Sequence, residues 1–431
     1  MGTVLIENGS VLSREGWLEP GYVWVVGERI EAVGPGKAPH EISDQAGEII
    51  SANFCAVLPG LVNAHTHLSQ TFMRGLAAGR PLIAWLKELI WPLQNTISPE
   101  ELHLAALLGL VENLRCGATE VVNHHKVITT TAHTDAVCRA ATAVGLRTTL
   151  ARAWSDRGEN CESPAAILAD LDRLFTLWHG VDHLKIANGP IALWRCSADM
   201  LRSSRELAQR NSSFTHFHVS ESLEEVRMSL EETGLRPVSW LDSIDVLGAD
   251  TQVVHAVWVD ENEIVLLAQA GAPVIHCPVS NAVLGSGIAP LAELQSQGVS
   301  VRLGTDGPAS NDTQDIWESL KTALSFARIK TLDVTVLSPR EALRLAMGAE
   351  ALIPGAPADL IIVNLNHPRA MPVHNIESAL ALSTHGSDVD TVLVAGQVLM
   401  RNRQLLMLDE AALLAECRQA IYSLRKRAGL T

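Results

Sequence analysis

The chain has 431 residues, of which 47% are hydrophobic, and this length suits a large barrel with a smaller domain beside it. Its formal net charge of −15 disfavours nucleic acids and anionic membranes as partners, and no apolar run is long enough to span a bilayer. The seven cysteines are widely spaced and form no Cys-x-x-Cys pair. We therefore expect a reduced, cytoplasmic protein without cysteine-ligated metal.

The first 58 residues have the pattern of short strands joined by turns. Residues 4–6 and 22–26 are apolar and are followed by turn-forming Asn-Gly or glycine residues, while residues 29–33 alternate polar and apolar side chains. That alternation is typical of a half-buried strand. This part of the chain predicts a small β unit.

Between residues 59 and 355, apolar strands alternate with amphipathic helices, which indicates a parallel sheet. Helices are expected at Pro99–Leu114, Thr134–Val144 and Ser222–Thr233. Eight strand–helix units in this length predict a (β/α)8 TIM barrel, whose active site lies at the carboxyl ends of its strands. The eight expected strands end near His67, His124, Arg152, Gly189, His218, His255, His276 and Asp306.

After the barrel, residues 360–363 and 391–396 again have the pattern of strands, and residues 409–427 that of a terminal helix. These strands resemble the N-terminal unit in style. We predict that residues 1–58 and 356–431 together form one composite β domain, a small β-sandwich that includes the terminal helix.

The stretch Pro59–His67 predicts a buried strand that ends in two histidines. His65 and His67 are two residues apart, so on a strand their side chains point to the same side and can bind one metal ion. Imidazole at this spacing suits zinc or another first-row divalent metal. Two polar residues at a strand end are the alternative explanation.

Three later segments offer further groups of the same chemical kind. His218 ends the fifth expected strand, and Glu221 follows it at a distance that suits an acid or base beside a metal ligand. His255 and Asp306 end two other strands, although a structural histidine and a turn aspartate would be equally ordinary there. His216 lies on the same face as His218, one step deeper. Three histidines and one carboxylate would leave room for water on the metal.

These motifs resemble those of the amidohydrolase superfamily, in its mononuclear branch of deaminases and triazine hydrolases. The resemblance rests on Pro59–His67, on His218-x-x-Glu221, on His276-Cys277-Pro278-x-Ser280-Asn281, and on Leu303–Asn311. It implies metal ligands and catalytic groups at matching positions. The ligands would be His65, His67, His218 and Asp306; the catalytic residues would be Glu221 as proton shuttle, with His255 and Asp306 at the attacking water.

The same resemblance implies one zinc per chain, with iron as an alternative, because the fourth strand ends without the lysine of the binuclear branches. It implies a hydrolase of carbon–nitrogen bonds in cyclic amidines, in which metal-activated water attacks an amino-bearing ring carbon and ammonia leaves. The expected substrate is a small purine, pterin, pyrimidine or triazine. We expect a homo-oligomer.

Substrate contacts are predicted for Gln94, His125 and Arg152. Gln94 replaces the glutamate that grips ribose hydroxyls in the thioadenosine branch, and Ile191 replaces a histidine of that branch, so the sequence favours a free heterocycle. A thioadenosine or adenosylhomocysteine deaminase, or a triazine chlorohydrolase, is the alternative. A non-catalytic barrel scaffold is a remote one, since it would be expected to have lost metal ligands.

Overall fold

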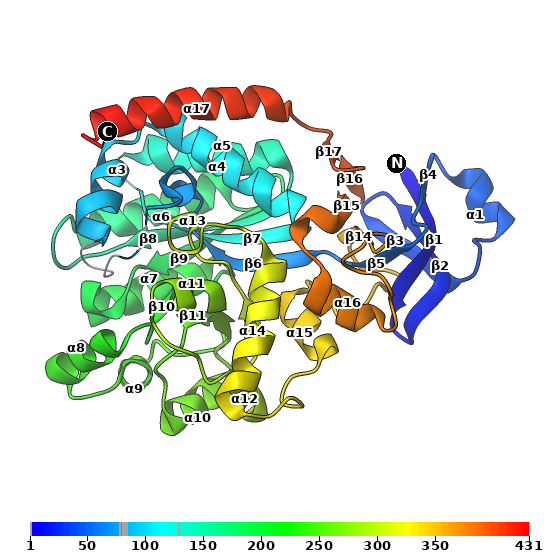
Figure 1. Cartoon of the computed structure of the whole chain (residues 1–431). Coiled ribbons are helices and arrows are strands. Elements are labelled where there is room, and N and C mark those ends of the chain that lie inside the picture. The colour runs from blue at the N-terminus through cyan, green and yellow to red at the C-terminus, as the bar shows by residue number, and fades with distance from the viewer. Residues whose placement is uncertain (1, 77–78, 80–84, 128–129, 431) are drawn as a thin grey trace.

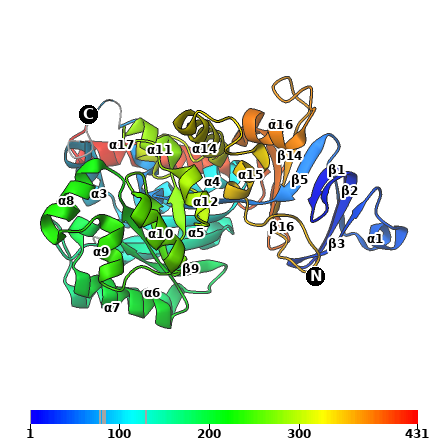
Figure 2. The same ribbon diagram turned by 90° about the horizontal axis from the view of Figure 1, so that it is seen from below.

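The computed structural model describes residues 2–76, 79, 85–127 and 130–430. A barrel of parallel strands and helices forms the larger part of the molecule, and a mixed sheet lies to one side of it in both views (Figures 1 and 2). The N-terminus lies beside that sheet, whereas the C-terminus lies at the far side of the barrel. The predicted fold class is confirmed.

In the described part of the chain, the barrel consists of eight parallel strands that follow one another in chain order. The backbone N–H of Asp306 donates to the carbonyl oxygen of His65 at 2.9 Å, which ties the turn after the last strand to the first strand. Each strand is largely buried, as expected for a sheet enclosed by helices. The strands are β6 (Leu61–Thr66), β7 (Ala118–His125), β8 (Arg147–Trp154), β9 (Leu184–Pro190), β10 (Thr215–Val219), β11 (Thr251–His255), β12 (Val274–His276) and β13 (Val301–Leu303).

The helices between the strands begin where the sequence supplies a cap. In α4 (Pro99–Arg115), Ser98 and Glu101 form a capping box, and Pro99 occupies the first turn, where its missing N–H costs nothing. The structure places the three expected helices at α4, α5 (Thr131–Val144) and α8 (Leu223–Thr233). The other barrel helices are α3 (Trp91–Thr96), α6 (Pro164–Trp178), α7 (Ala198–Arg210), α9 (Pro237–Ser243), α10 (Glu261–Ala270), α11 (Pro278–Val283), α12 (Leu291–Ser296), α13 (Pro308–Asn311), α14 (Ile316–Thr331) and α15 (Pro339–Ala346).

The mixed sheet joins the two ends of the chain in one hydrogen-bonded set of nine strands. Its central seam is the antiparallel pair β5–β14, in which Leu58 lies opposite Ile361. Small helices α1 (His40–Gln45) and α16 (Ile376–Ser383) accompany it. The strands are β1 (Thr3–Ser13), β2 (Gly16–Val26), β3 (Arg29–Pro35), β4 (Glu48–Ser51), β5 (Cys55–Pro59), β14 (Leu360–Asn364), β15 (Val389–Val394), β16 (Gln397–Arg401) and β17 (Gln404–Leu405).

The terminal helix α17 (Glu410–Arg427) leaves the mixed sheet and lies along the barrel helix α4 (Figure 1). Ion pairs hold both of its ends, because Arg115 pairs with Glu410 and Arg427 pairs with Glu101. The domain boundaries expected from the sequence stay a prediction. Among the residues that the structure describes, no helix is both long and apolar enough to cross a membrane.

Candidate active site

Four side chains converge at the carboxyl ends of the barrel strands. One ligand atom each from His65, His67, His218 and Asp306 lies within 4.8 Å of the other three. The Nε2 atoms of His65 and His67 lie 3.3 and 3.2 Å from Asp306 Oδ1. Ligand atoms about 2.0–2.1 Å from a tetrahedral zinc ion are about 3.3 Å apart, so these side chains fit such an ion. The buried His65 Nε2 makes no hydrogen bond of its own in this arrangement.

Backbone carbonyls fix the ring orientation of two of these histidines. The Nδ1 atom of His67 lies 2.7 Å from the carbonyl oxygen of His124, and that of His218 lies 2.7 Å from the carbonyl oxygen of Ile191. A carbonyl oxygen only accepts, so both Nδ1 atoms carry the proton and both Nε2 atoms offer a lone pair. Outer hydrogen bonds of this kind are what a metal-binding histidine requires.

The third histidine is oriented by a chain of side chains instead. His65 Nδ1 lies 2.7 Å from His216 Nε2, and His216 Nδ1 lies 2.8 Å from Gln252 Oε1. The amide oxygen accepts from Nδ1–H of His216, which leaves Nε2 of a neutral His216 as an acceptor. Burial lowers the pKa of His216 well below its ordinary value, so the ring is neutral. His65 therefore donates through Nδ1 and presents the lone pair of Nε2.

Asp306 is held from both of its oxygens. Oδ1 accepts from the backbone N–H of Gly307 at 2.7 Å, while Oδ2 accepts from the hydroxyls of Ser280 and Ser310 at 2.6 and 3.1 Å. Its φ of 63° is a left-handed conformation that a residue with a side chain seldom adopts. Strained backbone of this kind concentrates at functional sites, where the surrounding bonds enforce it.

The protonation states suit metal binding. Burial lowers the pKa of His65 to about 4 and lowers the pKa of His218 well below its usual range. Burial alone would raise the pKa of Asp306, but the close contacts with His65 and His67 outweigh it and hold that pKa well below the ordinary value. Neutral imidazoles and an ionised carboxylate are the forms that bind a cation.

His255 and Glu221 flank the metal cluster. His255 Nε2 lies 3.7 Å from Glu221 Oε2, and its Nδ1 lies 2.9 Å from Asn281 Oδ1, which fixes the proton on Nδ1. Burial lowers the pKa of His255, but the charges of Glu221 and Asp306 outweigh this and raise it above the ordinary value. The side chain of His255 is thereby set to receive or return a proton at Nε2.

The start of α8 positions Glu221. Ser220 has a φ of 55°, and the backbone N–H of Glu221 donates to Glu225 Oε2 at 2.8 Å. Ser222 caps the helix by accepting from the backbone N–H of Glu225. Burial raises the pKa of Glu225 to about 7. These contacts fix the backbone of the residue predicted to carry the proton.

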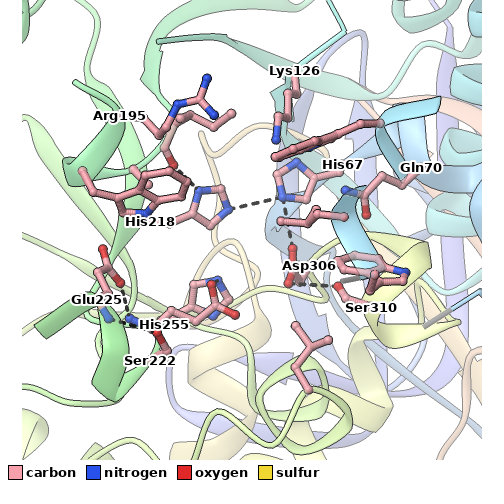
Figure 3. A pocket seen from close by; sticks show the side chains of 18 residues that line it. His67, Gln70, Lys126, Arg195, His218, Ser222, Glu225, His255, Asp306 and Ser310 are labelled. Atoms are coloured by element: carbon pink, nitrogen blue, oxygen red, sulfur yellow. Dashed lines mark hydrogen bonds and ion pairs between the residues drawn. The ribbon is translucent and has the colours of Figure 1, made fainter. Parts of the chain in front are cut away.

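A cavity of about 150 Å³ opens on this cluster (Figure 3). His67, His218, His255, Asp306 and Glu221 line it, so a molecule inside touches metal ligands and acid–base groups together. A second cavity of about 340 Å³ adjoins the first, because the two share four wall residues. These are Trp91, Lys126, Ile191 and Arg195.

The residues predicted to contact substrate lie at different depths. Gln94 is buried in the wall of the second cavity, and its Nε2 has no hydrogen-bond partner in the described part of the chain. His125 and Arg152 are register partners on β7 and β8 and line neither cavity. Arg152 pairs with Glu162 and Asp170 instead. The substrate contact of His125 and Arg152 stays a prediction that these cavities do not support.

Several site residues received no role from the sequence. Ser280 and Asn281 belong to the motif that follows β12, and that motif was the signal that could have assigned them to Asp306 and His255. Lys126 and Arg195 carry no motif at all. Only the packing of separate loops brings the latter two to one cavity.

Comparison with known proteins finds deaminases of adenine nucleosides among the relatives of this chain. The chain is 35% identical over 419 residues to a 5'-deoxyadenosine deaminase of Methanothermobacter thermautotrophicus, covering 95% of each chain. It is 32% identical over 443 residues to a 5-methylthioadenosine/S-adenosylhomocysteine deaminase of Pelotomaculum thermopropionicum, covering 99% of this chain and 100% of that one.

Solved structures agree with these relatives. A zinc-bound adenosine deaminase from Xanthomonas campestris superposes with a TM-score of 0.91 at 30% identity and covers 98% of both chains. A triazine hydrolase from Arthrobacter aurescens gives 0.90 at 25% identity, covering 98% of this chain and 100% of that one. The model of the amidohydrolase family matches residues 56–399. This chain, with its barrel and its three-histidine, one-aspartate cluster, belongs to the amidohydrolase family.

Proposed function

We propose that this protein holds one zinc ion per chain, with iron as the alternative metal, and hydrolytically deaminates the aminopurine of an adenine nucleoside. The observation that carries the choice of a nucleoside is the second cavity. The first cavity contains the ligands and acid–base groups, while the larger second one adjoins it and gives room for a substituent on the ring.

The reaction class expected from the sequence, hydrolytic deamination by a metal-dependent hydrolase acting on a cyclic amidine, is confirmed by the relatives named above. Their substrates are nucleosides with an adenine ring. The two adjoining cavities of this chain support the alternative weighed in the sequence, a nucleoside deaminase, over a free heterocycle.

The side chains divide the proton transfers between them. When bound, zinc supplies Lewis acidity that makes a water molecule a nucleophile near neutral pH. His255 and Asp306, which line the cavity, receive the proton of that water, and His255 passes it to Glu221, whose Oε2 lies 3.7 Å from His255 Nε2. Glu221 delivers this proton to the ring nitrogen next to the attacked carbon, so that negative charge does not build up there. The proton of the newly added hydroxyl group is then carried to the amino group, the carbon–nitrogen bond breaks, and ammonia leaves behind a ring carbonyl.

A free heterocycle remains the second candidate, and Gln94 is the observation that favours it. Its buried amide, with an unpartnered Nε2, can donate to a ring carbonyl and accept from a ring N–H. Gln94→Glu would replace that donor with a negative charge. If Gln94 contacts a free base, we expect kcat/KM on that base to fall roughly 10- to 100-fold, since a mismatched buried polar group costs ~1–3 kcal/mol.

The experiment that tests the proposal is an ammonia-release screen of the zinc-loaded protein. Each purine base is offered together with its nucleosides: adenine with adenosine and 5'-deoxyadenosine, and guanine with guanosine. A triazine and a pterin are offered alone. We expect the adenine nucleosides to give the highest kcat/KM. A free base that exceeds its nucleoside, together with the loss predicted for Gln94→Glu, would overturn the choice of a nucleoside in favour of a free heterocycle.

A further inference from the structure

Lys126 is a cation without a partner inside the substrate cavities. It follows the last residue of β7, at the face of the barrel that carries the active site, and lines both cavities. Its ammonium lies 5.9 Å from the centre of the Trp91 ring, and it makes no hydrogen bond or ion pair within the described ranges. A partly buried ammonium without an anion is costly unless a ligand supplies one.

Arg195 is the second cation at the junction of the two cavities. Its Nε and Nη2 donate to neutral oxygens only: the carbonyl oxygens of Arg157 and Glu159 and the hydroxyl of Ser155. Nη1 has no acceptor among the described residues, and no carboxylate pairs with the guanidinium there. These bonds fix the guanidinium in place, while no carboxylate of the described residues compensates its charge.

None of the carboxylates that line the cavities forms an ion pair with Lys126 or Arg195 among the described residues. Glu221 and Glu225 line the first cavity, where the metal ligands are. In the second cavity, Glu162 pairs with the buried Arg152, and Glu159 is exposed. With a net charge of −15 for the chain, positive potential can arise only locally, and these two side chains are its source at the cavity junction.

We propose that Lys126 and Arg195 form an anion subsite, which binds a carboxylate or phosphate carried by the substrate on the side away from the reacting ring. This rests on the proposed function, because only a substituted ring reaches from the metal ligands past both cations. The arrangement separates the roles by charge: acidic groups act on the ring, and basic groups hold the remote end.

The proximity of the two cations is also visible in their electrostatics. Burial first, and then the charge of Arg195, lower the pKa of Lys126 to about 8. An anion between them would reverse both effects. A planar guanidinium with a free Nη1 and a mobile ammonium suit the two oxygens of one carboxylate, or a phosphate.

The test compares adenosine derivatives that carry a carboxylate on the 5' side, at graded linker lengths, with their primary amides. Adenosine 5'-monophosphate forms the phosphate arm. Turnover is measured as kcat/KM on the zinc-loaded protein, and binding as Kd by calorimetry on Glu221→Gln, which is expected to bind without turnover. We expect at least one acid to exceed its amide by roughly 10- to 100-fold, the effect of one charge-assisted hydrogen bond.

Lys126→Met should abolish that preference, so that each acid and its amide give equal kcat/KM and equal Kd on the variant, because the ammonium that distinguishes a carboxylate from an amide is gone. Lys87→Met is the matched control: it removes the same charge from an exposed position outside both cavities and should leave the preference intact. Preference for the phosphate over every carboxylate would assign the subsite to phosphate.

Two outcomes would contradict the anion subsite and the proposed function independently of each other. Equal Kd for every acid and its amide removes the anion subsite, even if neutral nucleosides are deaminated well. If no nucleoside is turned over, the proposed function is wrong. The comparison of Kd values between acids and amides still shows in that case whether the anion subsite exists. A preference that survives in Lys126→Met would also remove Lys126 from it.

Discussion

At the scale of single residues, the orientation of His65 depends on groups that never approach a substrate. Gln252 fixes the proton of His216, and His216 fixes the proton of His65. Every ligand histidine thus has its Nδ1 satisfied by protein, and every Nε2 is free to bind. The donor set is prepared before any ion arrives, which lowers the ordering cost of binding.

His216→Phe keeps the ring volume but removes the acceptor for His65 Nδ1–H. We expect zinc affinity to fall roughly 10- to 100-fold, as is typical when an outer partner of a ligand is lost. His65→Ala removes a metal ligand itself and should lower metal content by more than tenfold. Its loss is the largest that we expect from a change at this histidine pair. Elemental analysis after dialysis against graded chelator measures both.

His124→Phe is the control for this change. His124 is a buried ring in the same cluster, and it orients His67 only through its backbone carbonyl, which the substitution retains. Its metal affinity should stay within about threefold of wild type. Equal losses in the two variants would mean that packing, and not the hydrogen bond to His65, supports the metal site.

Glu221→Gln should retain zinc but lose turnover. The amide is nearly isosteric with the carboxyl group but cannot carry the proton, and general acid–base groups typically contribute ~10²–10⁴-fold. Metal content and kcat are measured on the same sample. Retention of most of kcat would place the proton shuttle on another residue, with His255 next in reach at 3.7 Å.

At the scale of elements, helix α8 carries a titrating group at its first turn. Glu225 accepts from the backbone N–H of Glu221, and burial raises its pKa to about 7. Between the ordinary value of 4.5 and about 7, the folded carboxyl holds a proton that the unfolded chain has released. The free energy of unfolding therefore falls as pH rises through this window.

Glu225→Gln removes this dependence. The difference in free energy of unfolding between wild type and variant should change with pH between 4.5 and 7, with a slope approaching about 1.4 kcal/mol per pH unit and wild type losing stability at the higher pH. Urea unfolding at several pH values measures it. A constant difference across this window would show that Glu225 ionises normally in the folded protein.

The elements were largely predictable because their signals are local. Strand periodicity predicted that His65 and His67 point to one side, although β6 itself ends at Thr66, and a serine, a proline and a glutamate at fixed spacing marked the start of α4. The metal ligands followed from strand ends of a barrel, since all such ends meet at one face. Each of these inferences needs only the neighbours of a residue along the chain.

Other parts of the site were not predictable because they depend on the direction in which a side chain points and on distances between segments far apart in the sequence. Arg152 ends an expected strand, yet its side chain points to Asp170 on α6, on the face opposite to that of its neighbour Ala151. His125 alternates in the same way with His124, which lies among the ligand rings. The meeting of Lys126 with Arg195 depends on two loops separated along the chain.

At the scale of the whole molecule, the four ligands connect the first, fifth and last strands of the barrel. A metal ion held there binds the folded chain only, so it stabilises by mass action, about 2.7 kcal/mol at a free concentration 100 times its Kd. Removal of metal by chelator should lower Tm, and added zinc should restore it. An unchanged Tm in protein shown by elemental analysis to be metal-free would contradict this linkage.

The pairing of β5 with β14 also has a consequence during synthesis, because the two strands leave the ribosome at different times. Pro59 ends β5 and Leu360 begins β14, so 300 residues, 60–359, separate them along the chain. At roughly 5–20 residues per second, the ribosome adds the second strand roughly 15–60 s after the first. For that interval the nascent β5 has an open, apolar edge, which is a template for pairing with other chains. A ribosome that stalls inside the barrel therefore releases an aggregation-prone fragment, however well the barrel itself has begun to fold.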